Sequence, residues 1–142
     1  MTGFIGKIET LCSACELVYD QTHENSVRMM FEMDDDRSQM VIINGVETND
    51  GNEVVTIQSA VLKLEGLPNQ MLGGDMAKKL LRENSQMALA KWSIDETQDG
   101  KYLVATSNWY LETLDAEEFY RAVRVVAGAA DEMESTLGVD SF

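Results

Sequence analysis

Cys12 and Cys15 have the C-x-x-C spacing that occurs in thiol redox catalysts and in one half of a structural zinc site. A redox pair works because its first sulfur lies at a helix N-terminus, where the helix dipole lowers the pKa of the thiol. Apolar residues recur at spacings of three and four from Phe4 to Val18, which predicts a helix that begins near Phe4. Both cysteines then lie two turns or more inside the helix. We expect them to be buried and inert, with a thiol role as the alternative.

The other candidate ligands do not complete a metal site or a catalytic site. Structural zinc needs four ligands, and His23 is the only histidine. An EF-hand loop starting at Asp34 would need Gly and Glu where the chain has Gln39 and Gly45, so the acidic stretches "DDDRSQ" and "TNDGNE" are interpreted as hairpin turns. Neither a nucleophile elbow nor a phosphate-binding glycine loop is present. The sequence therefore predicts no enzyme, no cofactor and no metal.

Composition limits the partners and the organisation of the chain. The 142 residues fit one domain, 1–142, with no repeat or linker. Eleven Lys and Arg against 25 Asp and Glu give a net charge of −14, which would repel nucleic acid and an anionic membrane. No signal peptide or transmembrane run is visible, so we expect a cytoplasmic protein.

The hydrophobic pattern predicts the order α-β-β-β-α-β-β-α. After the first helix, strands are expected at 27–33, 39–45, 54–66, 89–94 and 101–111, with a second helix within 71–88. In that helix Met76, Leu80 and Leu81 are expected to be buried. Asp115 and Glu118 form a capping-box pattern that starts the last helix, and Gly138 is its expected C-cap. The predicted fold is a two-layer α+β domain with a five-stranded, mainly antiparallel sheet.

Several strands carry apolar residues on both faces, which predicts that either more of this chain or another chain covers the second face. Period-two alternation places Val41 and Ile43 together, and we expect Met30 and Val55 beside them as a partner-binding face. Nine methionines fit an adaptable surface, or they fill gaps in the core. Covering such a patch by two-fold pairing predicts a homodimer, with the expected contact at Met76, Leu80 and Trp92.

The segment from Leu80 to Leu137 resembles the YbjN family of bacterial proteins. The likeness is carried by a helix ending near Asn84, the strands "LAKWSID" and "GKYLVATSNWYL", and the final helix "LDAEEFYRAVRVVAGAADEMESTL". The element order also resembles the type III secretion chaperone fold, to which YbjN proteins are related. These are packing signatures and not catalytic motifs.

The resemblance implies a small acidic cytoplasmic protein, typically a homodimer, that binds polypeptide and performs no chemistry. Two functions follow as expectations. One is a chaperone-like module that binds an extended stretch of a client protein or peptide. The other is a regulator in bacterial sensory or stress signalling that acts through a folded protein partner.

Overall fold

The computed structural model describes residues 3–64 and 74–138, which form three helices and six strands. The elements in chain order are α1 (Phe4–Cys15), β1 (Asp20–His23), β2 (Ser26–Glu32), β3 (Ser38–Glu47), β4 (Glu53–Lys63), α2 (Gly74–Asn84), β5 (Lys91–Thr97), β6 (Gly100–Tyr110) and α3 (Ala116–Leu137). No helix within this described part is both long and apolar enough to cross a membrane.

The six strands form one antiparallel sheet in the order β1-β2-β3-β4-β6-β5. The α+β class is confirmed, but the prediction of five strands is wrong because it missed β1. All four residues of β1, "DQTH", are exposed, and the strand has an irregular register against β2. A short, polar edge strand has no apolar alternation, and alternation is the signal from which strands are predicted.

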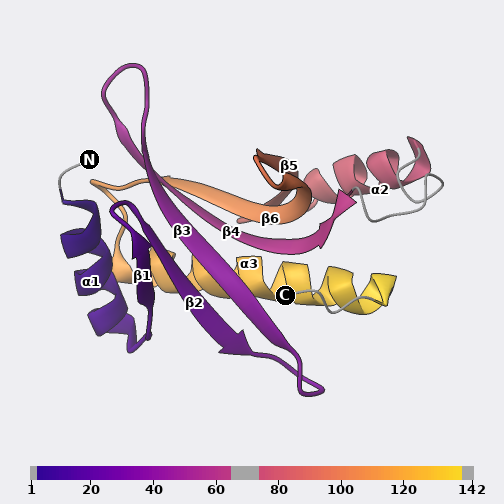
Figure 1. Cartoon of the computed structure of the whole chain (residues 1–142), viewed down its shortest axis with the longest axis horizontal. Helices are drawn as coiled ribbons and strands as arrows, with labels where there is room; N and C mark the ends of the chain where they lie inside the picture. The colour runs from indigo at the N-terminus through magenta and orange to yellow at the C-terminus, as the bar shows by residue number, and fades with distance from the viewer. Residues whose placement is uncertain (1–2, 65–73, 139–142) are drawn as a thin grey trace.

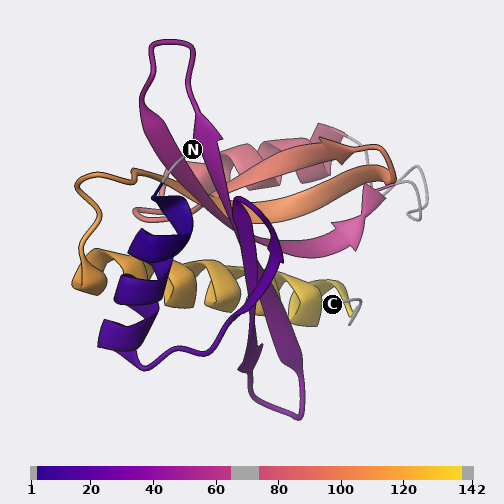
Figure 2. The same ribbon diagram turned by 60° about the vertical axis from the view of Figure 1, so that its left-hand side comes forward.

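The helices α1 and α3 cover one face of the sheet (Figures 1 and 2), and the hydrophobic core lies between these helices and the sheet. We call this the helix-covered face and the opposite one the open face. The helix α3 runs across β3, β4 and β6, and α1 packs against α3. The core includes apolar side chains from α1, α3 and the strands, among them Phe4, Ile8, Ile43, Ile57 and Phe119.

The ends of α3 are fixed as the sequence predicts. The Asp115 side chain accepts a hydrogen bond from the Glu118 backbone N–H at 2.8 Å, and the Glu118 side chain accepts one from the Asp115 N–H at 3.1 Å. This capping box satisfies backbone donors that have no partner within the helix. At the other end Gly138 takes a φ of 72°, which a residue without a Cβ adopts without strain.

The helix α2 lies beside β5 at the edge of the sheet. None of its residues is buried, which corrects the prediction for Met76, Leu80 and Leu81. Met76 and Leu80 are half-buried against the core, whereas Leu81 is 69% exposed. Helical spacing therefore identified the apolar stripe correctly in Met76 and Leu80, but the described chain covers the stripe only in part.

Candidate functional site

Strand register divides the apolar residues of the central strands between the two faces. Met29 pairs with Val41 and Val27 with Ile43, so these four side chains share the helix-covered face. Met30 pairs with Met40, and both point to the open face together with Ile42. Met30 is 58% exposed, and Met40 and Ile42 are half-buried. The open face is therefore apolar near its centre, and neither α1 nor α3 lies over it.

A groove of about 150 Å³ lies on this open face. Gln58 of β4 donates from Nε2 to Oδ2 of Asp95 of β5 at 3.1 Å, although β6 lies between these two strands. This contact shows how strongly the sheet curls here. Val104 on β6 is only 2% exposed, although it faces the groove and not the helices. The groove is lined by Met40, Ile42, Gln58, Ala60, Asp95, Thr97, Tyr102 and Val104.

Charged and polar groups gather at one end of the groove. The Tyr102 hydroxyl donates a hydrogen bond to Asp99, and Lys63 Nζ lies 3.6 Å from Oδ1 of the same carboxylate. These two contacts lower the pKa of Asp99, the hydrogen bond from Tyr102 being the larger cause. Asp99 therefore stays ionised at neutral pH. Asp95 lines the groove and gives it a negative border, whereas the charge of Asp99 is paired with Lys63.

The predicted partner-binding set needs a correction. Val41, Ile43 and Val55 do share one face of the sheet, but that face is the helix-covered one, and all three are fully buried in the core. Met30 lies on the opposite face. Period-two alternation finds which residues point the same way, but both faces of β3 are apolar, so alternation does not identify the face that the helices cover.

Gln58 and Asp95 were not predicted as site residues. No local motif marks them, because they come from strands far apart in the sequence. Only the pairing of β4 with β6 and of β6 with β5 brings their side chains together. The half-buried state of Met40 and Ile42 likewise depends on this long-range pairing.

The two cysteines lie at the end of α1, where the helix dipole disfavours a thiolate. Cys12 is buried, and burial raises the pKa of its thiol to about 11, with a further contribution from Cys15. Cys15 is half-buried, its Sγ donates to the carbonyl oxygen of Ala116 at 3.3 Å, and burial raises its pKa as well. The predicted burial is confirmed for Cys12 and holds only in part for Cys15.

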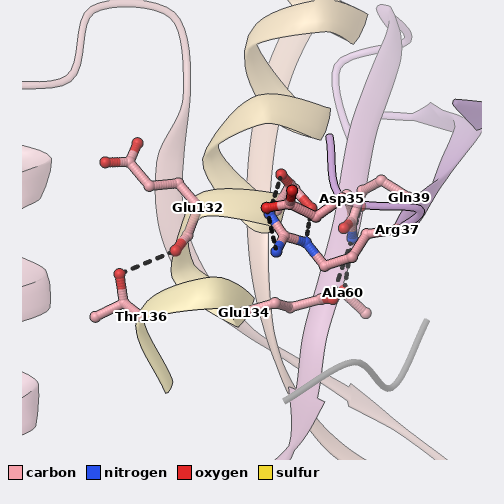
Figure 3. A network of polar contacts seen from close by, with 9 residues as sticks. Asp35, Arg37, Gln39, Ala60, Glu132, Glu134 and Thr136 are labelled. Atoms are coloured by element: carbon pink, nitrogen blue, oxygen red, sulfur yellow. Dashed lines mark hydrogen bonds and ion pairs between the residues drawn. The ribbon is translucent and has the colours of Figure 1, made fainter. Parts of the chain in front are cut away.

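A buried polar network joins the C-terminal half of α3 to the start of β3 (Figure 3). Arg37, in the turn before β3, donates to both carboxylate oxygens of Asp131, at 2.9 and 3.1 Å. Gln39 Nε2 donates to Ser59 Oγ at 2.8 Å and to Glu134 Oε1 at 3.1 Å. Gln39 and Glu134 are fully buried. The network joins α3 to β3 and β4 through polar contacts within the helix-covered layer.

The residues predicted for a dimer contact lie near one another at the β5 edge. Trp92 on β5 is buried, and it lines a pocket between α2 and α3 with Met87 and Met133. Met76 and Leu80 are half-buried on α2. Asn84, the last residue of α2, holds the helix to the strand: its side chain donates to the Trp92 carbonyl at 3.1 Å and accepts from the Trp92 N–H at 2.6 Å.

The residues that suggested a metal site in the sequence lie in turns or far from one another. "DDDRS" connects β2 to β3, with the Arg37 carbonyl accepting from the Met33 N–H at 2.8 Å. "TNDGNE" connects β3 to β4, where Gly51 takes a φ of 86°. His23 is exposed on β1. Within residues 3–64 and 74–138, no three His, Cys, Asp or Glu side chains are grouped so that they could hold a metal ion.

Comparison with known proteins finds a likeness of fold. No protein-family model matches the chain, and no curated protein sequence matches it. Among solved structures, YbjN from E. coli, a protein proposed to be a transcription regulator, aligns with a TM-score of 0.55 over 92% of this chain and 87% of that chain. The two sequences are 14% identical, so the likeness concerns the fold alone. The resemblance of the element order to the type III secretion chaperone fold stays a prediction. The chain has a YbjN-like fold, as its C-terminal sequence predicts.

Proposed function

We propose that this protein is a chaperone-like binding module that takes up an extended stretch of a client protein or peptide and has no catalytic activity. The observation that carries this proposal is the apolar groove on the open face of the sheet, which α1 and α3 leave uncovered. Contiguous exposed apolar surface bordered by polar groups is typical of protein-binding sites.

The chemistry of the groove favours a basic, partly apolar client. Met40 and Ile42 provide apolar contacts from flexible or branched side chains, and Asp95 provides negative charge beside them, on a chain whose net charge is −14. Burying a few apolar side chains is worth about 1.5–3 kcal/mol each, before the cost of ordering the client is subtracted. A dissociation constant on the order of micromolar is therefore expected. The acidic border should make association faster at low salt.

The first test compares binding of an unfolded basic polypeptide to the wild type and to the double variant Met40→Asp/Ile42→Asp. Both side chains are half-buried on the open face, so the change alters the groove and spares the core. Fluorescence anisotropy should show at least a tenfold weaker interaction.

The matched control for this test is Tyr120→Asp/Val125→Asp, which adds the same two charges at exposed positions of α3 on the other side of the sheet. It should bind like the wild type. Circular dichroism checks that both double variants fold. Equal binding by the groove variant and the control would remove the open face from consideration.

The proposal includes a homodimer in which α2 and the neighbouring part of β5 form the contact. In its support, α2 has no buried residue in the single chain and has Leu81 exposed beside the half-buried Leu80. An amphipathic helix is stable when its apolar stripe is covered, and two-fold pairing of identical surfaces is the commonest way to cover it.

A regulator that acts through a folded protein partner is the second candidate. It is favoured by the structural likeness to YbjN, for which a role in transcription regulation has been proposed. A net charge of −14 opposes direct contact with the DNA backbone, so such a regulator would act through another protein. Binding of extended polypeptide to the open face would favour the chaperone-like module over this candidate.

A further inference from the structure

The strand β5 forms one edge of the sheet, and the described part of the chain covers this edge only at its beginning. The Asn84 side chain bonds to both the N–H and the carbonyl of Trp92, as a residue of a neighbouring strand would do. Lys91 Nζ also donates to the Asn84 carbonyl, at 2.6 Å, which holds the end of α2 against the start of the strand. The Asn84 side chain thus takes the place of a neighbouring strand at Trp92 and covers the sheet edge at that residue.

Beyond Trp92 no residue within 3–64 or 74–138 pairs with this edge. In an antiparallel pair, the N–H and C=O of alternate residues point to opposite sides of the strand. Because the Trp92 groups point outward and the β5–β6 register is regular, those of Ile94 and Glu96 point outward as well. Neither backbone has a hydrogen-bond partner on that side among the described residues. Ile94 is 58% exposed, so its side chain is also accessible.

The opposite edge of the sheet is a poor alternative. There β1 has four residues and an irregular register against β2, and short or bulged edge strands resist further pairing. By contrast, β5 has seven residues and pairs with β6 without a bulge. Its open part from 93 to 97 spans about 17 Å at the usual rise per residue of a strand, enough for roughly five residues of a partner.

A second copy of this chain does not fit the open edge. Pairing Ile94 with the second Glu96 would place Asp95 directly opposite the second Asp95, and a register centred on Glu96 would bring two glutamates together. A register centred on Ile94 needs the Trp92 groups that Asn84 already occupies. Like charges directly opposite each other on neighbouring strands are destabilising.

We infer that the open edge of β5 accepts an extended, basic polypeptide segment as a seventh strand, which runs beside the open-face groove. This inference rests on the proposed function and specifies its binding mode. Backbone hydrogen bonds to Ile94 and Glu96 supply sequence-independent affinity, and side chains opposite β5 supply selectivity. A lysine or arginine suits the positions facing Asp95 and Glu96, and an apolar residue suits the position facing Ile94. An antiparallel segment therefore reads basic, basic, apolar.

The groove and the open edge belong to one surface. Asp95 and Thr97 of β5 line the groove, so a strand added beside β5 would run along the border of the groove. A client side chain that points to the open face from this added strand would lie toward Met40 and Ile42.

The test uses a fluorescent synthetic peptide with two adjacent lysines followed by a valine, flanked by threonines, and three altered forms of it. One form has its lysines replaced by glutamates. The other two are N-methylated on alternate residues, one on the odd and one on the even positions, which removes backbone donors without changing side chains. We expect the glutamate form to bind at least tenfold more weakly. One methylated form should weaken by a similar factor, while the other, whose methyl groups face away from β5, binds like the parent.

Amide exchange in the wild-type chain gives a second readout that needs no variant. The amides of Ile94 and Glu96 should exchange at least tenfold more slowly when the peptide is bound, and those of β1 should not change. As a variant test, Ile94→Pro removes one outward N–H that makes no bond to β6 and should weaken binding, while Val18→Pro, at an exposed site outside the sheet, should not.

The outcomes separate the two proposals. Peptide binding that is lost in Met40→Asp/Ile42→Asp but is insensitive to both methylation patterns, with unchanged exchange at Ile94 and Glu96, would overturn strand addition and leave the groove as the binding site. No binding of any unfolded or extended polypeptide would overturn the proposed function together with this inference.

Discussion

At the scale of single residues, Cys12 shows how position decides the chemistry of a motif. A C-x-x-C pair is reactive when the helix N-terminus stabilises a thiolate, but here both sulfurs lie at the C-terminal end of α1. Burial also raises the pKa of Cys12 to about 11 from its ordinary 9.0. The sequence already argued against a dipole-activated thiol, because the start of the helix could be placed from the apolar spacing.

The raised pKa of Cys12 predicts a stability change at high pH. A group whose pKa is higher in the folded state contributes stability below its unfolded pKa and loses that contribution as pH rises through the folded value. The contribution of Cys12 should therefore be complete below about pH 9 and decline between pH 9 and 11. Other groups titrate in this range, so the measurement is the difference in unfolding free energy between wild type and Cys12→Ala. That difference should shrink as pH rises from 9 to 11, and a constant difference would contradict the prediction.

Thiol labelling gives a separate check on the same residue. At pH 7.5 an alkylating reagent should modify Cys12 at least tenfold more slowly in the native protein than in urea, because the native thiol is buried and protonated. A Cys15→Ala background isolates the Cys12 signal. Labelling of native Cys12 within seconds would show that the thiol is accessible and ionised.

At the scale of elements, the polar network between β3 and α3 is the feature that the hydrophobic pattern could not reveal. Gln39 is fully buried while its neighbour Met40 is only half-buried, which is the reverse of what hydrophobicity alone would assign. The reason is that Gln39 lies under α3, where Ser59 and Glu134 accept hydrogen bonds from its amide nitrogen, whereas Met40 points to the open face. Strand positions were predictable, but the assignment of faces required the register between distant elements.

The contact between Arg37 and Asp131 should carry a measurable part of the stability. Arg37→Ala leaves the Asp131 carboxylate, which is largely buried, without two hydrogen bonds from a charged donor. A hydrogen bond to a charged group contributes about 1.5–3 kcal/mol, so a loss of unfolding free energy in that range is expected in urea denaturation. The control is Arg121→Ala, whose partner Glu117 is exposed, and it should cost less than about 0.5 kcal/mol. Equal losses of unfolding free energy in the two variants would mean that the buried ion pair contributes no more to stability than the exposed one.

At the scale of the whole molecule, the fold is asymmetric. Helices cover one face of a curled six-stranded sheet, and the other face and one edge stay accessible in the described chain. Order and class of most elements followed from local patterns, since turns, caps and alternation are encoded within a few residues. The accessible surface did not, because it arises where β3, β4, β6 and β5 meet, and these strands are brought together only by long-range pairing.

The exposed stripe of α2 predicts the assembly state. If α2 forms the contact of a homodimer, sedimentation equilibrium at micromolar concentration should give twice the monomer mass of 15.8 kDa. Leu80→Glu places a charge in the half-buried stripe and should shift the equilibrium to monomer, because an uncompensated charge at an interface costs several kcal/mol. Val18→Glu adds the same charge at an exposed site far from α2 and should leave the dimer intact. A wild-type protein that sediments only as a 15.8 kDa species would rule out the dimer and leave the peptide-binding test of the open face unaffected.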